Sequence, residues 1–201
     1  MALPRAEVTD GLLSELQTFE ALIRPLTAEQ WERPSRCEGW TVGDVARHTI
    51  GSLTDVVEGR LDGLGTPEVT KREVDERAGR SPAQLADEAA TTAKGAAGLL
   101  PMFDDAAWDA PAPGGYEGTL GDGVEALWYD TWLHGNDIRA AVGMPEVLGP
   151  GLKGGLSHIA TEVRKHGYEG EVPSNDDDAF AFILAATGRG PAQAGVPSLY
   201  A

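Results

Sequence analysis

Apolar residues recur at intervals of three and four along most of this 201-residue chain, and no segment alternates apolar and polar residues as a half-buried strand does. The first helical stretch runs from Val8 to Leu26, and Pro25 is expected to close it. The same spacing predicts the remaining helices, long ones over about 42–61, 81–100 and 119–143 and shorter ones after Thr27, at 151–166 and at 177–187. The sequence therefore predicts an all-α fold, a bundle of four long helices with little or no sheet.

Three of the predicted helix starts have capping signals. Thr27 is followed three residues later by Gln30, and Thr41 by Asp44, which is the pattern of a capping box. The run Ser81-Pro82-Ala83-Gln84 combines a cap, a proline at the first helical position and a glutamine at the third. These signals mark the starts of the short helix after Thr27 and of the long helices over about 42–61 and 81–100.

Two stretches between the helices lack a helical pattern. Residues 62–80 are rich in glycine and charge, and they predict a long connection with room for a helical turn. Residues 104–118 contain three glycines and two prolines and predict a loop. Gly143 suits the C-terminal cap of the fourth long helix. After it, the sequence predicts helices only at 151–166 and 177–187.

Composition excludes several classes of function. No stretch approaches the roughly 18 consecutive apolar residues of a transmembrane helix, and the N-terminal segment lacks the order of a signal peptide. We therefore expect a cytoplasmic protein with no membrane partner. A net charge of −16 argues against nucleic acid as a partner, because phosphate binding needs a basic surface. The single cysteine builds neither a disulfide framework nor a cysteine-rich zinc site, so a metal would need histidine and carboxylate ligands.

The segment ALWYDTWLHGNDIRAAVG (126–143) predicts a mostly buried helix, yet it places Asp130 and His134 one turn apart on the inward side. His48 flanks the inward stripe of the second long helix and is the candidate third ligand. Two histidines and a carboxylate would leave one coordination position of a divalent metal open, as in catalytic sites. The spacing alone leaves an alternative, because a histidine on an apolar face is often a hydrogen-bonded core residue.

Four segments resemble those of a known family. PSRCEGWTVGDVARH (34–48) resembles the N-terminal motif of the mycothiol-dependent maleylpyruvate isomerase family, within the wider DinB-like superfamily. DTWLHGNDIRAAVGMP (130–145) resembles the second motif of that family, in which an acid and a histidine lie four residues apart. VDERAGRSPAQL (74–85) is similar to its middle segment and ILAATGR (183–189) to its C-terminal signature.

This resemblance implies a DinB-like up-and-down four-helix bundle over residues 1–146, with a short helical C-terminal extension over 147–201 packed on it. It also implies that His48, Asp130 and His134 bind a divalent metal, usually zinc. The family often has glutamate where this chain has Asp130, and the shorter side chain would draw the metal toward the fourth long helix or bind it less tightly. In better-known members an arginine from the C-terminal region serves catalysis, and Arg189 is the candidate for that role here.

The function that the resemblance implies is activation of a low-molecular-weight thiol, mycothiol, for attack on a small electrophile. Such an enzyme would be a thiol transferase or a cis–trans isomerase. Two alternatives stay open: a metal-dependent hydrolase that uses water on the same bundle, and a metal-free binding module. The isomerase is expected to have a further C-terminal domain that this chain lacks, so maleylpyruvate is not the expected substrate. Dimers are common in the superfamily, so a homodimer is among the expectations.

The remaining candidates have simpler interpretations. We expect four tryptophans to pack in the core rather than to contact a substrate: Trp31, Trp40, Trp128 and Trp132. Cys37 lacks a nearby His or Lys pattern and is expected to be an inert, partly buried thiol. Asp137 either accepts a hydrogen bond from a metal-binding histidine or pairs with Arg139. His158 and His166 are expected to face solvent.

Overall fold

The computed structural model describes residues 3–199, and within that range it contains helices and loops but no strand. The four long helices are α1 (Arg5–Ile23), α3 (Val42–Glu58), α5 (Pro82–Leu99) and α7 (Leu120–Val142). The other helices are α2 (Ala28–Trp31), α4 (Pro67–Glu76), α6 (Asp105–Trp108), α8 (Gly149–Lys165) and α9 (Asp176–Ala186). Single 3₁₀ turns lie at Leu100–Met102 and Pro113–Gly115. The predicted all-α fold is confirmed.

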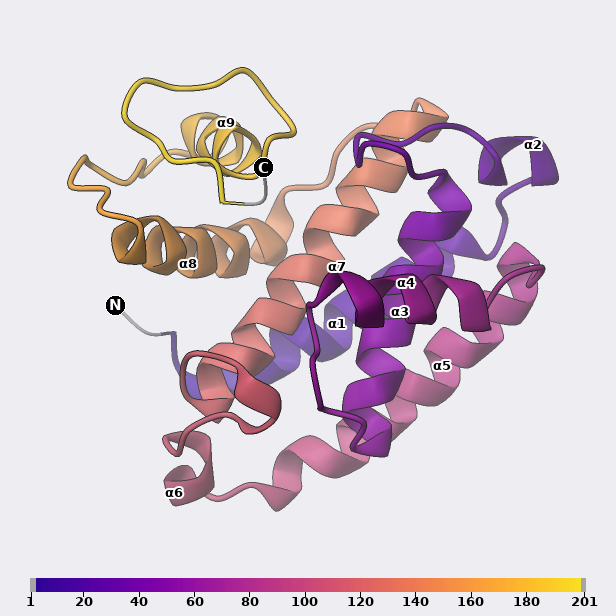
Figure 1. Cartoon of the computed structure of the whole chain (residues 1–201), viewed down its shortest axis with the longest axis horizontal. Coiled ribbons are helices and arrows are strands. Elements are labelled where there is room, and N and C mark those ends of the chain that lie inside the picture. The colour runs from indigo at the N-terminus through magenta and orange to yellow at the C-terminus, as the bar shows by residue number, and fades with distance from the viewer. Residues whose placement is uncertain (1–2, 200–201) are drawn as a thin grey trace.

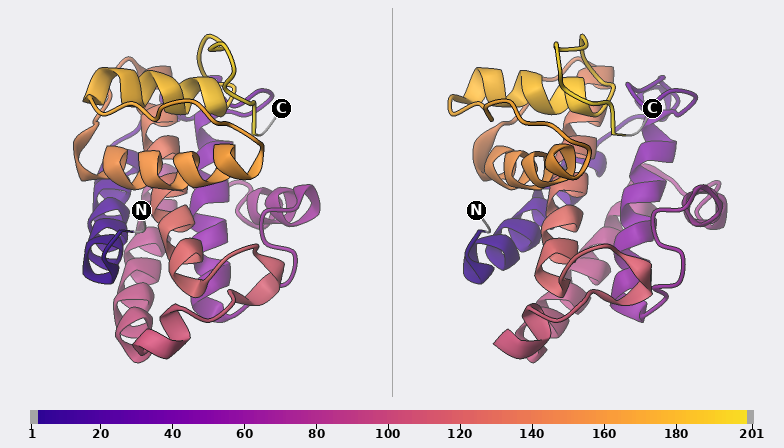
Figure 2. Two further views of the ribbon diagram at one scale, coloured as in Figure 1. Left: turned by 90° about the vertical axis from the view of Figure 1, so that its left-hand side faces the viewer. Right: turned by 60° about the vertical axis from the view of Figure 1, so that its left-hand side comes forward.

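The long helices form a bundle in which α1 and α3 each pack against both α5 and α7 (Figure 1). The two C-terminal helices stack on one another, and α8 lies against α7 and α1 (Figure 2). The short helix α4 lies against α3 on the outside of the bundle. A helical extension thus follows the bundle, while its start at residue 147 as a domain boundary stays a prediction. None of the helices in the described residues is long and apolar enough to cross a membrane.

The capping signals in the sequence are realised as hydrogen bonds. The Thr27, Thr41 and Ser81 side chains each accept a bond from the backbone N–H three residues on, and the residue there bonds back to the cap. The second long helix ends three residues before the predicted position, at Glu58. Gly59 follows it in the left-handed conformation, with φ +76°, and closes the helix as only glycine readily does.

The interpretation of 62–80 as mainly a connection was wrong, because α4 is a ten-residue helix within it. Thr66 caps it by accepting a bond from the Val69 N–H, and Pro67 occupies the first helical position. The segment lacks an apolar stripe, so periodicity could not reveal the helix. The predicted loop at 104–118 likewise contains the single-turn helix α6, whose start is capped by Asp104.

Two apolar clusters share α7. Trp128 belongs to the cluster inside the four-helix bundle, and Trp132 to the cluster between α7, α8 and α9. Both indole side chains are 1% exposed, Trp31 is buried as well, and Trp40 is half-buried against the bundle core. The core interpretation of the tryptophans is therefore confirmed, and α7 is buried on both of its broad faces.

The predicted solvent exposure of His158 was wrong, whereas that of His166 is confirmed. His158 lies on α8 and is 7% exposed, and its ring stacks on Tyr129 with the ring centroids 4.6 Å apart. Burial of the ring lowers its pKa to about 4, so the imidazole is neutral at physiological pH. The sequence contained no signal for this, because the partner ring lies on a different helix.

Glycines on the helices facing α7 make room for its large indoles. A Cβ built on Gly154 of α8 would lie 2.6 Å from the Trp128 Cε3 atom, and one on Gly11 of α1 would lie 2.3 Å from its Cζ2 atom. Trp128 is therefore enclosed between two helix backbones that glycine allows to come close. The large indole on α7 thus packs against glycines on the neighbouring helices, which leaves no space between them.

We expect Gly154→Ala to lower the free energy of unfolding by about 1–3 kcal/mol, because the added methyl group overpacks the Trp128 ring. Urea denaturation would measure the change. Gly98→Ala on α5 is the matched control, since nothing lies within 4 Å of its Cβ position. There the gain in helix propensity should raise stability by up to about 1 kcal/mol. Equal effects of the two substitutions would contradict the packing argument.

The partly buried Glu15 on α1 makes the stability of the protein depend on pH. Burial raises its pKa from 4.5 to about 7, although attraction from Arg139 opposes the rise. Between these pH values the folded protein keeps a proton that the unfolded chain releases, so stability falls as the pH rises from 4.5 to 7. Relative to Glu15→Gln, the wild type should lose about 3 kcal/mol at most over this interval. Denaturation curves at several pH values would measure it, with exposed Asp10→Asn as the control.

Candidate metal centre

Helices α3 and α7 bring three potential ligands to one point. His48 Nε2 lies 3.9 Å from Asp130 Oδ2, and His134 Nε2 lies 3.3 Å from Asp130 Oδ1. The two imidazole rings are perpendicular, with their centroids 5.3 Å apart. One nitrogen or oxygen atom from each of the three residues lies within 4.8 Å of the others. The structure thus brings together the three residues predicted as a ligand set.

The local structure of each helix explains this convergence. Thr41 and Asp44 cap the start of α3, and His48 follows one turn later, facing α7. Asp130 and His134 lie one turn apart on α7, so their side chains point to the same spot. The Asp130 side chain is 32% exposed, compared with 13% for His48 and 8% for His134. Asp130 is therefore the most solvent-exposed member of the cluster.

The far nitrogen of each imidazole contacts a buried carboxylate. His48 Nδ1 lies 2.8 Å from Glu73 Oε2 of α4, and His134 Nδ1 lies 3.0 Å from Asp137 Oδ2. The Glu73 side chain is 1% exposed and that of Asp137 is fully buried. An ionised carboxylate can only accept a hydrogen bond, so each ring donates from Nδ1. With a metal present, both rings would then offer the Nε2 lone pair to it, whereas without a metal protonated His134 donates from Nε2 to Asp130.

The electrostatics of the cluster favour a cation. Burial opposes the charge of Asp130, but attraction and a hydrogen bond from His134 outweigh it and lower the pKa of Asp130 to about 2. Burial likewise disfavours protonated His134, yet Asp130 and Asp137 raise its pKa well above the usual 6.5. The acids thus keep their charge and attract a positive group between them. In the absence of a metal that positive charge is a proton on imidazole, which a metal ion would displace.

A zinc-like divalent ion fits the residues present. Two atoms that each lie about 2 Å from one ion are at most about 4 Å apart, and the nitrogen–oxygen distances of 3.3 and 3.9 Å satisfy this. Two imidazole nitrogens and a carboxylate are a common zinc donor set. The carboxylates behind the rings are the partners that metal-binding histidines usually have. The set leaves a position for a further ligand on the exposed side.

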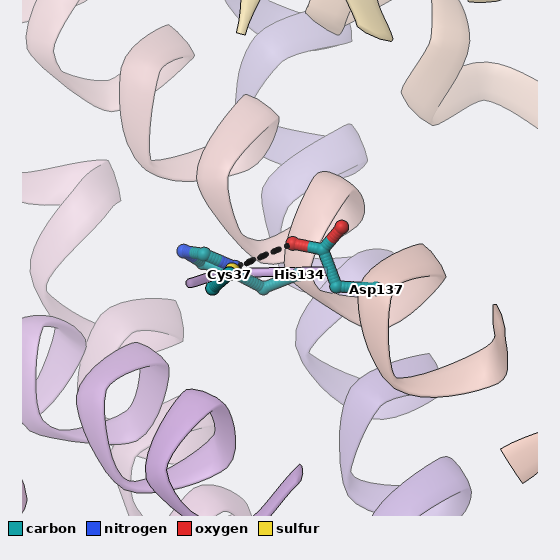
Figure 3. Close-up of side chains that lie close together, drawn as sticks. All are labelled: Cys37, His134 and Asp137. Carbon is teal, nitrogen blue, oxygen red and sulfur yellow. Dashed lines mark hydrogen bonds and ion pairs between the residues drawn. The ribbon is translucent and has the colours of Figure 1, made fainter. Parts of the chain in front are cut away.

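A second group of side chains, Cys37, His134 and Asp137, also lies close together. Figure 3 shows the Cys37 and His134 side chains directed toward the Asp137 carboxylate. This carboxylate also accepts bonds from the Nε atoms of Arg36 and Arg189, at 3.1 and 2.9 Å. A cation here would face two guanidinium groups, so we interpret this group as a hydrogen-bond network beside the candidate metal centre.

The loop between α2 and α3 delivers Cys37 to this network. Ser35 and Trp40 close the loop, the Ser35 N–H donating to the Trp40 carbonyl at 2.9 Å, and Gly39 takes the left-handed turn with φ +79°. Cys37 Sγ lies 3.3 Å from Asp137 Oδ2 and 3.9 Å from His134 Nδ1. The thiol is partly buried as expected, but the expectation that no histidine lies nearby was wrong, because α7 supplies one.

The C-terminal extension delivers Arg189, the predicted catalytic residue. α9 ends at Ala186, and the chain turns back so that the Arg189 N–H donates to the Leu184 carbonyl at 2.8 Å. The guanidinium group lies on Asp137 and donates from Nη2 to Cys37 Sγ at 3.4 Å. Of the two alternatives for Asp137, the hydrogen bond to His134 is the one observed. Arg189 therefore lies on the Asp137 carboxylate that contacts the candidate ligand His134, while its catalytic role stays a prediction.

Sequence reasoning missed two residues of the site. Glu73 lies one residue before the stretch 74–85 that resembled the family and within a run of charged residues, which usually indicates a solvated surface. Arg36 lies in the first motif but carries no recognisable pattern. Neither residue type nor spacing distinguishes these two from exposed neighbours, because their partners come from other helices.

The fold and this cluster define an all-α protein with a candidate metal centre between helices of a four-helix bundle. A family model, the mycothiol maleylpyruvate isomerase N-terminal domain, matches residues 12–139, which include all three candidate ligands. The chain belongs to this family, as the resemblance of its motifs indicated.

Relatives of known sequence and structure agree with this assignment. Two uncharacterized proteins, from two strains of Mycobacterium tuberculosis, are each 26% identical over 185 residues, which covers 84% of this chain and 68% of each relative. A crystal structure of the mycothiol-dependent maleylpyruvate isomerase superposes with a TM-score of 0.65 at 15% identity. A histidine-to-alanine mutant of that isomerase gives the same TM-score at 16% identity.

These superpositions cover 94% of this chain and 90% of the isomerase chain. The bundle and the helices that follow it therefore resemble the isomerase in fold over nearly the whole of both chains. The expectation that the isomerase has a further domain missing from this chain was wrong, since little of the isomerase lies outside the superposition. Chain length therefore does not distinguish this protein from the maleylpyruvate isomerase in fold.

Proposed function

We propose that this protein is a divalent-metal-dependent enzyme, with zinc as the expected metal, that activates mycothiol for attack on a small electrophile. The reaction would be either a thiol transfer or a cis–trans isomerisation. The family supports mycothiol as the cosubstrate. The observation that carries the proposal is the convergence of two Nε2 atoms and one carboxylate, with both imidazoles backed by buried carboxylates. Two histidines that merely fill a core would also need hydrogen-bond partners, but their Nε2 atoms would not need to meet at one partly exposed carboxylate.

His48, Asp130 and His134 would hold the metal, which when bound lowers the pKa of a coordinated thiol so that thiolate exists at neutral pH. Asp130 is the most exposed of the three proposed ligands, so the thiol and the electrophile would approach the metal from its side. Asp137 holds the His134 ring by its Nδ1 atom, so the Nε2 atom of that ring stays directed at the centre. The thiolate sulfur would add to one carbon of a conjugated double bond, whose π electrons move onto the conjugated carbonyl. Rotation about the resulting single bond and elimination of the same thiolate would complete an isomerisation, whereas protonation of the adduct would complete a thiol transfer.

We further propose that Arg189 contributes positive charge beside the centre for an anionic substrate. Its guanidinium group is 11% exposed and held by Asp137, so its position is determined before any substrate binds. The charge of Arg189 also contributes to lowering the pKa of Asp130, which places its field at the ligand cluster. Arg36 on the other side of Asp137 leaves its Nη2 atom without a hydrogen-bond partner among the described residues.

His48→Ala should abolish both zinc binding and mycothiol-dependent turnover of an electrophile panel. Zinc content should fall from about one ion per chain to near zero, because two protein ligands rarely hold zinc in water. Elemental analysis and a thiol-consumption assay would measure the two quantities. His166→Ala is the matched control, since that histidine is exposed directly after α8 and belongs to neither cluster. A His48→Ala protein that keeps metal and activity would refute the assignment.

The same assay separates the two enzyme classes that this bundle allows. Turnover that needs added mycothiol supports the thiol-dependent proposal. Turnover of ester or amide substrates at full rate without any thiol would instead identify a hydrolase with water as the nucleophile. A protein that binds no metal and turns over no substrate would be a binding module that has kept the fold.

Arg189→Lys should lower kcat/KM for anionic electrophiles by about tenfold or more while zinc content stays unchanged. Lysine keeps the charge, but it lacks the planar guanidinium group that can donate to Asp137 and to a substrate group at the same time. Uncharged electrophiles serve as the internal control, and their turnover should change much less. If both substrate classes lose activity equally, Arg189 would act through the position of His134 rather than on the substrate.

A further inference from the structure

The placement of α4 is unusual for a helix on the outside of a bundle. Among its ten residues, all of which the structure describes, Glu73 alone is buried. Most surface helices dock by burying an apolar stripe, whereas this one buries a carboxylate. Burying a charge is costly unless it is paired, so α4 needs a partner for Glu73 inside the protein. That partner is the Nδ1 atom of His48, at 2.8 Å.

Charged side chains hold α4 in this place. Asp55 of α3 is fully buried and pairs with Arg72 of α4 and with Arg60. Arg77, directly after α4, donates from Nη2 to Glu88 of α5 at 2.7 Å. Ion pairs of Arg72 and Arg77, which lie on either side of Glu73 in the sequence, thus hold the helix against α3 and α5.

A glycine on α3 allows the close approach. A Cβ built on Gly51 would lie 2.6 Å from the Glu73 Cβ atom, so any larger residue there would push α4 outward. Gly51 lies one turn after His48, on the side of α3 that α4 covers. The chain therefore has a specific device that brings this carboxylate to this histidine, rather than a chance surface contact.

We infer that Glu73 is a positioning residue that keeps His48 in the tautomer with its proton on Nδ1, so that the Nε2 lone pair faces the candidate metal centre. The inference rests on the proposed function, because the tautomer matters only if Nε2 binds a metal. Asp137 does the same for His134 from the same helix, whereas Glu73 acts from α4. The two histidines are thus oriented by carboxylates from two different helices.

Glu73→Gln is the informative substitution, because it keeps the volume and removes the charge. A glutamine amide can accept from Nδ1–H through its oxygen, but it can also donate to a bare Nδ1 through its nitrogen. The second arrangement stabilises the tautomer with the proton on Nε2, which cannot bind a metal through that atom. The variant should therefore bind zinc about 10- to 100-fold more weakly than the wild type.

The experiment combines metal affinity with a direct reading of the tautomer. Zinc affinity of the full chain is measured by competition with a chromogenic chelator, using zinc alone and no thiol. Glu76→Gln is the matched control, since it removes a charge from the same helix and contacts Arg60, Arg72 and Arg77 but not His48. Long-range nitrogen–proton NMR on metal-free protein at alkaline pH then assigns the protonated nitrogen of His48.

We expect weaker zinc binding in Glu73→Gln alone, and an Nδ1–H tautomer of His48 that becomes mixed in that variant. Equal affinity of Glu73→Gln and wild type, in a protein whose His48→Ala variant loses zinc, would overturn this inference and leave the proposed function intact. A wild type that binds no zinc would overturn both. The NMR reading of the wild type needs no variant to fold, and a His48 proton found on Nε2 would by itself overturn the inference.

Discussion

The burial of α7 on both of its broad faces is the constraint on which the rest of the structure depends. A helix shared by two apolar clusters has no solvent to satisfy the polar side chains it brings inside, so each of them needs a protein partner. Asn136, fully buried, exchanges two hydrogen bonds with the Val147 backbone, and Trp132 donates to the same carbonyl. These bonds determine where the chain leaves α7 and where α8 begins.

The same requirement accounts for the candidate site. Asp137 is a fully buried charge, and it is stabilised because loop 34–41, α7 and the segment after α9 each supply a donor to it. Segments from three distant parts of the chain thus meet at one carboxylate directly behind His134. The C-terminal extension consequently does more than cover an apolar face, since it delivers Arg189 to the wall of the centre. Stability of the extension and geometry of the site are coupled through this residue.

The helices that carry strong local signals could be predicted from the sequence. Capping at Thr41 and Ser81 depends on residues three positions apart, so it is decided within one turn whatever the rest of the chain does. α4 was missed although Thr66 and Pro67 mark its start, because no apolar stripe follows them. Its position depends on ion pairs with Asp55 and Glu88 on two other helices, and such pairs leave no periodic pattern in its own segment. His158 was misplaced because its burial depends on a ring of another helix.

By itself the sequence determined the long helices and the buried character of α7, because spacing along a helix fixes which residues share a face. The resemblance of its motifs to a family added His48 to the pair Asp130 and His134. Only the tertiary structure decided what stands behind each imidazole. Glu73 and Asp137 carry similar carboxylates, but one comes from α4 and the other from the next turn of α7. Hydrogen bonds between helices depend on how those helices dock, and docking is the sum of packing and charge over the whole chain.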